Sequence, residues 1–227
     1  MVRKTAGALT FSASYTLASA MDNTSSLTDV LPNAYDDRNY WGPSDFQVPQ
    51  ALTVSYTYAI PFHAQNRIAR TAFGDWTISG INQFQAGTPF SVRQNIDYAG
   101  IGPGSGNQFW NVTGDPHGCS TDFVPNVGAT IYCKDAFAAP ALGTFASGNS
   151  RNTFRNPGFW QWNLAIHKAF PLPINEGSRI EFRAETFNLL NHPNWGGANS
   201  NPVSSSFMRV TSKSGSRNLQ FELKLSF

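Results

Sequence analysis

The most constraining feature of the sequence is a strict two-residue alternation at its C-terminal end. In the stretch RNLQFELKLSF, apolar side chains occupy every second position and polar or charged ones stand between them. A period of two is the repeat of a β-strand, whose successive side chains point to opposite faces. A chain end with one wholly apolar face must be docked, because free ends are normally polar and mobile. The apolar positions are Leu219, Phe221, Leu223, Leu225 and Phe227.

Five further stretches show the same alternation, and helix-period stretches are essentially missing. Together with the terminal stretch they predict an all-β protein of about six antiparallel strands. The five stretches are Ala8–Ala18, Ala51–Ile60, Phe73–Gln85, Phe159–Phe170 and Arg179–Leu190.

The connections between these stretches alternate in length. Residues 61–72 and 171–178 form short connections, whereas 19–50, 86–158 and 191–216 are long. If neighbouring strands run up and down, every long connection falls at one end of the sheet. Outer-membrane barrels follow this rule, with short periplasmic turns and long extracellular loops. We therefore expect a transmembrane β-barrel arrangement with a long external loop at about 88–156, and we assign Phe207–Thr211 to the last external loop.

The composition agrees with a barrel and excludes other classes. Charged residues make up only 13% of the chain, against roughly 25% in average proteins. The mean hydropathy of −0.30 suits strands that alternate polar and apolar positions. The sequence contains no run of about 18 apolar residues, which excludes a transmembrane helix, and we recognise no signal peptide. The net charge of +2 is spread without a Lys/Arg cluster, so no nucleic-acid partner is expected.

The two faces of the strands predict two environments. In hydrocarbon every backbone polar group must be paired, so a sheet enters a bilayer only when it closes on itself. The terminal apolar face would then contact lipid, and the opposite face would line a wet lumen. Two alternatives stay open: a core strand of a soluble domain, and a one-sided sheet whose charged face is solvated. The expected lumen-facing residues are Arg179, Glu181, Arg183, Glu185, Gln220, Glu222 and Lys224.

Candidate chemistry is sparse. Cys119 and Cys133 can close a loop worth about 3 kcal/mol in an oxidising compartment, or they can be two free thiols. No zinc-type ligand spacing accompanies them, and no cofactor is expected. No nucleophile elbow, metalloprotease helix or phosphate-binding glycine loop is present, so no enzyme is predicted. The alternation of glutamates with arginines at 179–185 favours mutual neutralisation over raised pKa values.

Four stretches resemble one family in the right order along the chain. SYTLASAMD, GDWTISGINQFQAGTPFSV, RNTFRNPGFWQWNLAIHKAF and RIEFRAETFNLLNHPNW, followed by SFMRVTSKSGSRNLQFELKLSF, look like the C-terminal end of TonB-dependent outer-membrane receptors. The resemblance is to the Oar-like branch common in Acidobacteria, whose penultimate strand carries a Phe-Arg-Ala-Glu core and whose last strand opens on Arg and ends on Phe.

The resemblance implies that residues 1–227 are the C-terminal segment of a 22-stranded, plugged barrel in the outer membrane of a Gram-negative cell. Six strands cannot close a barrel, so we expect a fragment that does not transport alone. The implied partners are outer-membrane lipid, the barrel-assembly machinery, the remaining strands and plug, and TonB through the missing N-terminal part. Ligand contacts are expected from the long external loop, including Phe109, Trp110, Asp115, His117 and Tyr132.

Other classes of protein fit parts of the pattern. A secreted β-sandwich that binds carbohydrate or mediates adhesion would also alternate, and would use exposed tryptophans as stacking platforms. A small adhesin-like barrel, or an oligomeric barrel built from several copies, is a further alternative. The sandwich reading requires two sheets packed around a dry centre.

Overall fold

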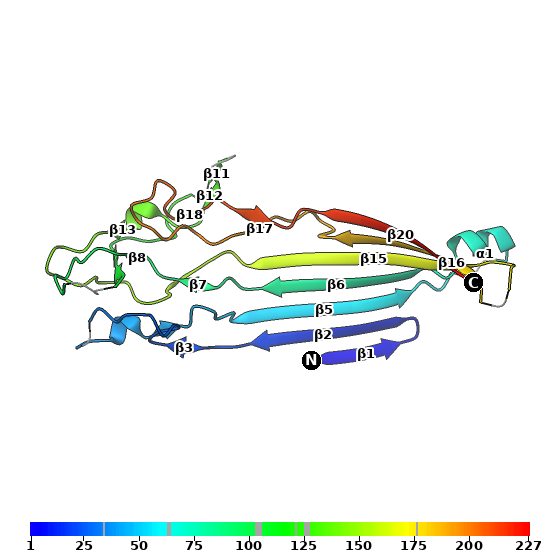
Figure 1. Ribbon diagram of the computed structural model, residues 1–227, viewed down its shortest axis with the longest axis horizontal. Helices are drawn as coiled ribbons and strands as arrows, with labels where there is room; N and C mark the ends of the chain where they lie inside the picture. Colours follow the sequence, from blue (N-terminus) through cyan, green and yellow to red (C-terminus); the bar gives the residue numbers. More distant parts are fainter. Residues whose placement is uncertain (34, 63–64, 103–105, 121, 125–127, 176) are drawn as a thin grey trace.

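The computed structural model describes residues 1–33, 35–62, 65–102, 106–120, 122–124, 128–175 and 177–227. The protein is an antiparallel seven-stranded meander with long connections at one end (Figure 1). The strands pair in chain order, so each neighbour in the sheet is the next long strand in the sequence. They are β1 (Val2–Ala6), β2 (Leu9–Leu17), β5 (Gln50–Ala59), β6 (Thr77–Gln85), β15 (Phe159–Pro171), β16 (Arg179–Phe187) and β20 (Asn218–Ser226).

The structure confirms the all-β antiparallel fold and all six predicted strands, with differences at their ends. The third strand starts at Thr77, because Phe73 ends the helix α1 (Arg67–Phe73), which the search for periodicity missed. The fifth strand ends at Phe187 instead of Leu190, because Asn188 adopts a left-handed conformation with φ of +53°. The buried Asn188 side chain donates to the carbonyl of His192 and accepts from the amide of His192. These two hydrogen bonds fix the turn.

A seventh strand, β1, pairs with β2 through a two-residue hairpin turn. Gly7 opens the turn with φ of +58°, a conformation that glycine adopts without steric cost. The alternation does not predict β1, because its five residues are too few for a recognisable two-residue repeat. The sheet is open, since β1 and β20 each pair with one neighbour only.

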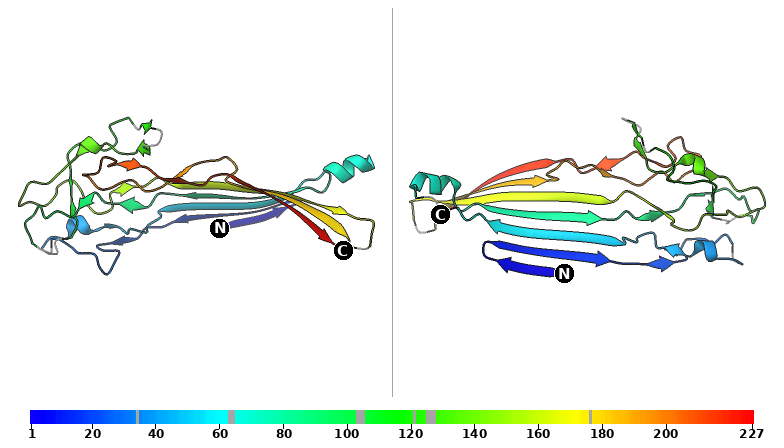
Figure 2. Two further views of the ribbon diagram at one scale, coloured as in Figure 1. Left: turned by 45° about the horizontal axis from the view of Figure 1, so that its top comes forward. Right: turned by 180° about the vertical axis from the view of Figure 1, so that it is seen from behind.

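The predicted segregation of connections is confirmed. The long connections 18–49, 86–158 and 188–217 lie at one end of the sheet, and the short ones lie at the other end with α1 (Figures 1 and 2). Phe207–Thr211 belongs to the last long connection, where β18 (Arg209–Val210) pairs outside the main sheet. No helix in the described part of the chain is long and apolar enough to cross a bilayer.

Small paired elements organise the long connections. Two 3-10 turns occur at Arg38–Tyr40 and Lys134–Ala136. The two-residue pairs are β3 (Met21–Asp22) with β4 (Gly42–Pro43), β7 (Pro89–Phe90) with β14 (Phe154–Arg155), β8 (Arg93–Gln94) with β9 (Gln108–Phe109), β10 (Asn111–Val112) with β13 (Phe137–Ala138), and β17 (Asn194–Trp195) with β19 (Lys213–Ser214); β12 (Gly128–Thr130) joins β11 (Phe123–Val124) to β18.

The buried core also lies in these connections. Phe154 is 4% exposed, and its ring centre lies 5.2 Å from the ring centres of Phe137 and Tyr132. Phe207 and Met208 of the last connection complete this cluster. Among the described residues, no second sheet faces the seven-stranded one, so the sandwich alternative does not describe this fold.

A disulfide joins Cys119 and Cys133, whose Cα atoms lie 5.6 Å apart. Cys133 is buried in the cluster of the long connections, and the amide of Cys119 donates to its sulfur. The pairing that the sequence left open is therefore present, and it ties the tip around residue 119 to the packed cluster.

Candidate functional site

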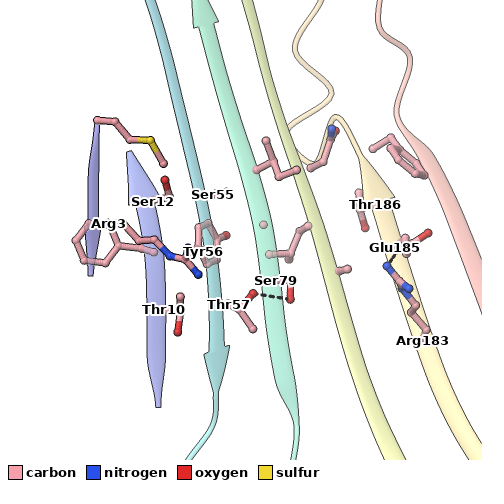
Figure 3. Close-up of a pocket in the computed structure, with 18 residues that line it drawn as sticks. Arg3, Thr10, Ser12, Ser55, Tyr56, Thr57, Ser79, Arg183, Glu185 and Thr186 are labelled. Atoms are coloured by element: carbon pink, nitrogen blue, oxygen red, sulfur yellow. Dashed lines mark hydrogen bonds and ion pairs between the residues drawn. The ribbon is translucent and has the colours of Figure 1, made fainter. Parts of the chain in front are cut away.

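Two surfaces of the molecule have the composition of functional sites: the polar face of the sheet, and the place where the long connections meet. On the sheet, the register aligns hydroxyl-bearing residues across neighbouring strands. Thr10 lies opposite Thr57, and Thr57 opposite Ser79, whose hydroxyl group is 3.3 Å from that of Thr57. A groove of about 530 Å³ runs across these positions (Figure 3). Apolar side chains, among them Met1, Ile81 and Phe187, also line this groove. Its hydroxyl and charged residues, which run from β1 to β16, are Arg3, Thr10, Ser12, Ser55, Thr57, Ser79, Arg183 and Glu185.

The charged residues predicted on the fifth strand share this polar face and neutralise one another. Arg179 pairs with Glu181, and Arg183 with Glu185, each at 2.6 Å along the strand. The register with β20 adds opposite charges across the strands, because Glu181 faces Lys224 and Arg183 faces Glu222. Such cross-strand pairs stabilise a sheet modestly. Gln220 lies opposite Glu185 on the same face.

The opposite face of the sheet is mainly apolar, and a small residue on it makes room for a large one. Gly80 lies between Tyr56 and Leu164 in the register, and a Cβ atom there would meet the Tyr56 ring at 2.4 Å. The missing side chain thus leaves room for the ring of Tyr56, whose hydroxyl accepts a bond from the indole of Trp162 at 3.1 Å. The terminal strand presents Leu219, Phe221, Leu223 and Leu225 on this face, all exposed.

The second surface is a polar cavity of about 610 Å³ to which all three long connections contribute. Asp45 comes from the first connection, Arg93 and Asn95 from the second, and Asn201 from the third. Carboxamides and hydroxyls dominate the rest of its wall, which consists of Pro89, Phe90, Ser91, Gln94, Asn107, Asn152 and Ser200. A cavity that assembles distant segments and is rich in both donors and acceptors is suited to a hydrophilic ligand.

Arg151 organises the wall of this cavity although it does not line it. Its side chain is 2% exposed and forms ion pairs with Asp22 and with Asp45, the latter at 2.8 Å. Arg151 Nη2 also donates a hydrogen bond to the hydroxyl of Ser25 at 2.6 Å. Burial lowers the pKa of the Arg151 guanidinium, but an arginine stays charged in proteins. The buried cation therefore holds two carboxylates of the first connection against the second.

Asn152 continues this clamp from the neighbouring position, with a positive φ of +56°. Its amide nitrogen donates to Asp45 Oδ1 at 2.6 Å and to the carbonyl of Pro43. Ser91 donates to Asn152 Oδ1 at 2.9 Å and accepts from its backbone amide. One carboxylate oxygen of Asp45 thus receives bonds from both Arg151 and Asn152. The Asp45 side chain as a whole remains 46% exposed.

The next Arg-Asn pair, Arg155 and Asn156, also forms hydrogen bonds between the long connections. Arg155 donates to Gln47 of the first connection at 2.8 Å. Asn156 bonds Thr88 and accepts from the amide of Ala198, which belongs to the third connection. The segment RNTFRNP therefore joins all three long connections. In the sequence this segment stands out only through the family resemblance; its repeated Arg-Asn pair is the signal that could have identified it as a junction.

The five residues expected in ligand contacts lie elsewhere, and none of them lines the polar cavity. Phe109 is buried at 4% exposure, while Trp110 and Tyr132 pack against the buried cluster. Asp115 and His117 are exposed and pair weakly at 3.8 Å, near the ring of Tyr132. The structure thus gives the three aromatic residues a packing role, and it offers no group of metal-ligating side chains among the described residues.

An antiparallel meander with one apolar and one polar face, and with all long connections at one end, defines the class of outer-membrane β-barrels. The family described as "Outer membrane beta barrel domain" matches residues 1–220. The chain therefore belongs to this family, and its location is the outer membrane. No curated protein and no solved structure matches the chain.

Proposed function

We propose that the chain supplies seven consecutive strands to the barrel of a TonB-dependent outer-membrane receptor of the Oar-like type. The strand meander and the family support a barrel, and the resemblance of the strand segments described above supports the finer assignment. In this proposal the apolar face, including Leu219 to Leu225, contacts lipid. The polar face lines the lumen, where Arg183 and Glu185 are neutralised by pairing.

The single observation that carries a receptor role is the meeting of the three long connections at one polar cavity. External loops carry binding in barrels because a rigid scaffold positions them. Here the scaffold is the sheet, and the Arg151 clamp fixes the loops to one another. We propose that the cavity makes first contact with a hydrophilic ligand before its uptake.

The proposal includes partners that complete the barrel. The open sheet leaves β1 and β20 with unpaired edges, and the smallest bacterial barrels need 8 strands. We infer that these edges pair with further strands of a larger receptor, that the barrel-assembly machinery inserts the whole, and that TonB delivers energy through a part outside this segment. The segment alone is then not competent for transport.

Fractionation and conductance test this proposal. The chain, expressed in a Gram-negative host with an export signal, should be recovered from detergent-extracted outer membranes or as aggregate, and should give no steady channel conductance in planar bilayers. Recovery as a soluble periplasmic monomer would contradict a lipid-facing sheet. Steady conductance from the purified chain would contradict the need for further strands.

A further inference from the structure

The short helix α1 in the connection between β5 and β6 has features that the barrel does not require. Asn66 caps it, with Oδ1 accepting from the amides of Ile68 at 2.8 Å and Ala69 at 3.4 Å. Gly74 ends it by donating to the carbonyl of Arg70. The helix lies at the end of the sheet opposite the long connections (Figure 2).

The sequence of α1 is amphipathic despite its length. At about 100° per residue, Ile68, Ala69, Ala72 and Phe73 fall on one arc of about 140°. Arg70 and Thr71 fall on the opposite side. An apolar arc facing a basic polar arc is the pattern of helices that lie in the plane of a membrane interface.

The helix is attached to the apolar face of the sheet through Lys168. This lysine lies opposite Phe182 in the register, in a row that continues to Leu223, yet it is only 3% exposed. Its Nζ donates to the carbonyls of Thr71 and Gly74 at the C-terminal end of the helix. A cation there is favourable because the last carbonyls of a helix lack partners and carry partial negative charge.

Aromatic side chains reinforce the attachment. The indole of Trp76 donates to the carbonyl of Ala72 at 3.0 Å and its ring meets Phe182 edge-on at 6.1 Å. Lys168 Nζ lies 5.0 Å from the ring centre of Phe170 and 5.7 Å from that of Trp76. The helix therefore has a defined place at the rim of the apolar face.

Most of the apolar arc of the attached helix is exposed. Ile68 is 80% exposed and Phe73 63%, and Phe62, which touches Phe73 at 6.1 Å between ring centres, is 41% exposed. Lys168 and Trp76 place this surface beside the apolar face of the sheet, and the neighbouring Arg70 is exposed and suits anionic phosphate groups. Tryptophan at the same rim is typical of membrane interfaces.

We propose that α1 is an interfacial foot: its apolar arc enters the phospholipid leaflet on the side of the short connections, while Arg70 stays among the headgroups and Lys168 fixes the helix to the sheet. This rests on the proposed lipid contact of the sheet. The occupant is phospholipid, because the exposed arc is attached beside the face of the sheet proposed to contact lipid and has a cation, Arg70, next to it.

Site-specific labels test the foot. Single cysteines at Ile68→Cys, Thr71→Cys and Leu223→Cys carry an environment-sensitive fluorophore, with the native disulfide left intact. The chain is inserted into phosphatidylethanolamine–phosphatidylglycerol vesicles with brominated acyl chains, and aqueous iodide is the opposing quencher. We expect bromine to quench the labels at 68 and 223, with position 68 about 5–10 Å inside the headgroup boundary, and iodide to quench the label at 71.

The label at 223 separates the two proposals. Bromine quenching at 223 with iodide quenching at 68 would overturn the foot and leave the lipid-facing sheet standing. Iodide quenching at both 223 and 68 would overturn both. Equal bromine quenching at 68 and 71 would contradict an interfacial position, because an interfacial helix keeps one side in water.

Discussion

The strands and the long connections of this molecule differ in whether their apolar side chains are exposed or buried. Every buried apolar side chain among the described residues lies in the long connections, whereas the apolar residues of the terminal strand are 56–73% exposed. The buried set is Tyr40, Val92, Phe109, Cys133, Ala136, Phe137, Phe154, Phe207, Met208 and Val210.

The difference follows from the solvent that each region meets. The connections project into water and must bury their apolar groups internally, which they do around Phe154 with a disulfide and a buried cation in support. The sheet has no such centre, because hydrocarbon can cover its apolar face and only its backbone bonds must be made within the protein. In the proposed barrel, the same chain therefore combines a core of the kind found in water-soluble proteins, in its connections, with an exposed apolar surface that contacts lipid.

The largest expected effect that tests this contrast is Phe154→Ala. Removing a ring packed against Phe90, Tyr132 and Phe137 leaves a cavity and should lower the stability of the connections by about 3–5 kcal/mol. Hydrogen exchange with mass spectrometry should show the loss in residues 88–156 and little change in the sheet. The matched control is Phe221→Ala, at an exposed position where we propose that lipid fills the space. An equal loss in the sheet for both variants would contradict separate cores.

The next prediction concerns charge on the apolar face. Phe221→Arg places a cation on a face proposed to meet lipid and should destabilise the inserted chain by about 2–4 kcal/mol if the site lies near the bilayer midplane. Gln220→Arg is the control, because position 220 faces Glu185 on the polar face. Urea titration of the chain in lipid vesicles measures both. Similar losses of stability in the two variants would contradict the proposal that one face contacts lipid and the other lines the lumen.

A smaller effect is expected from reducing the Cys119–Cys133 disulfide. The bond closes a short loop within the second connection, so its removal should cost at most about 3 kcal/mol in the chain-entropy model. Protease nicking should increase near residues 115–136 and leave β15, β16 and β20 protected. Faster cleavage of those strands would show that the two regions are more tightly coupled than we infer.

The smallest effect is a pH dependence at Asp97. Its carboxylate accepts from the amides of Gly102 and Ile101 and from Gln108, and the bond from Gly102 is the main reason that the pKa of Asp97 lies below its ordinary value. A lowered folded-state pKa contributes stability above the unfolded value, and this contribution is lost as pH falls through the folded value.

Exchange of the Gly102 and Ile101 amides, corrected for intrinsic rates, should therefore accelerate as pH falls below the ordinary aspartate pKa of about 3.9 and through the lower folded-state value. In Asp97→Asn the two amides should be less protected above this range and show no such step. A step of the same size in the variant would assign the effect to another group.

The arrangement of the strands could be predicted because it depends on local periodicity. Alternation along Arg179 to Phe187 and from Leu219 onward identifies strands and their faces, and the lengths of the connections determine which end of the sheet each one occupies. The errors occurred where a single residue or a short segment decides the outcome. Asn188 ends a strand through its left-handed conformation, and α1 is too brief to register as a helix.

Six of the seven long strands, their faces and the end at which the long connections gather could be inferred from the sequence, since they follow from repeats along neighbouring positions and from the lengths between them. Only the tertiary structure decided that Arg151 meets Asp22 and Asp45, that one cavity draws on three connections, and that Lys168 holds α1. These contacts join residues far apart in the chain, and their energy depends on burial and geometry that no local pattern contains.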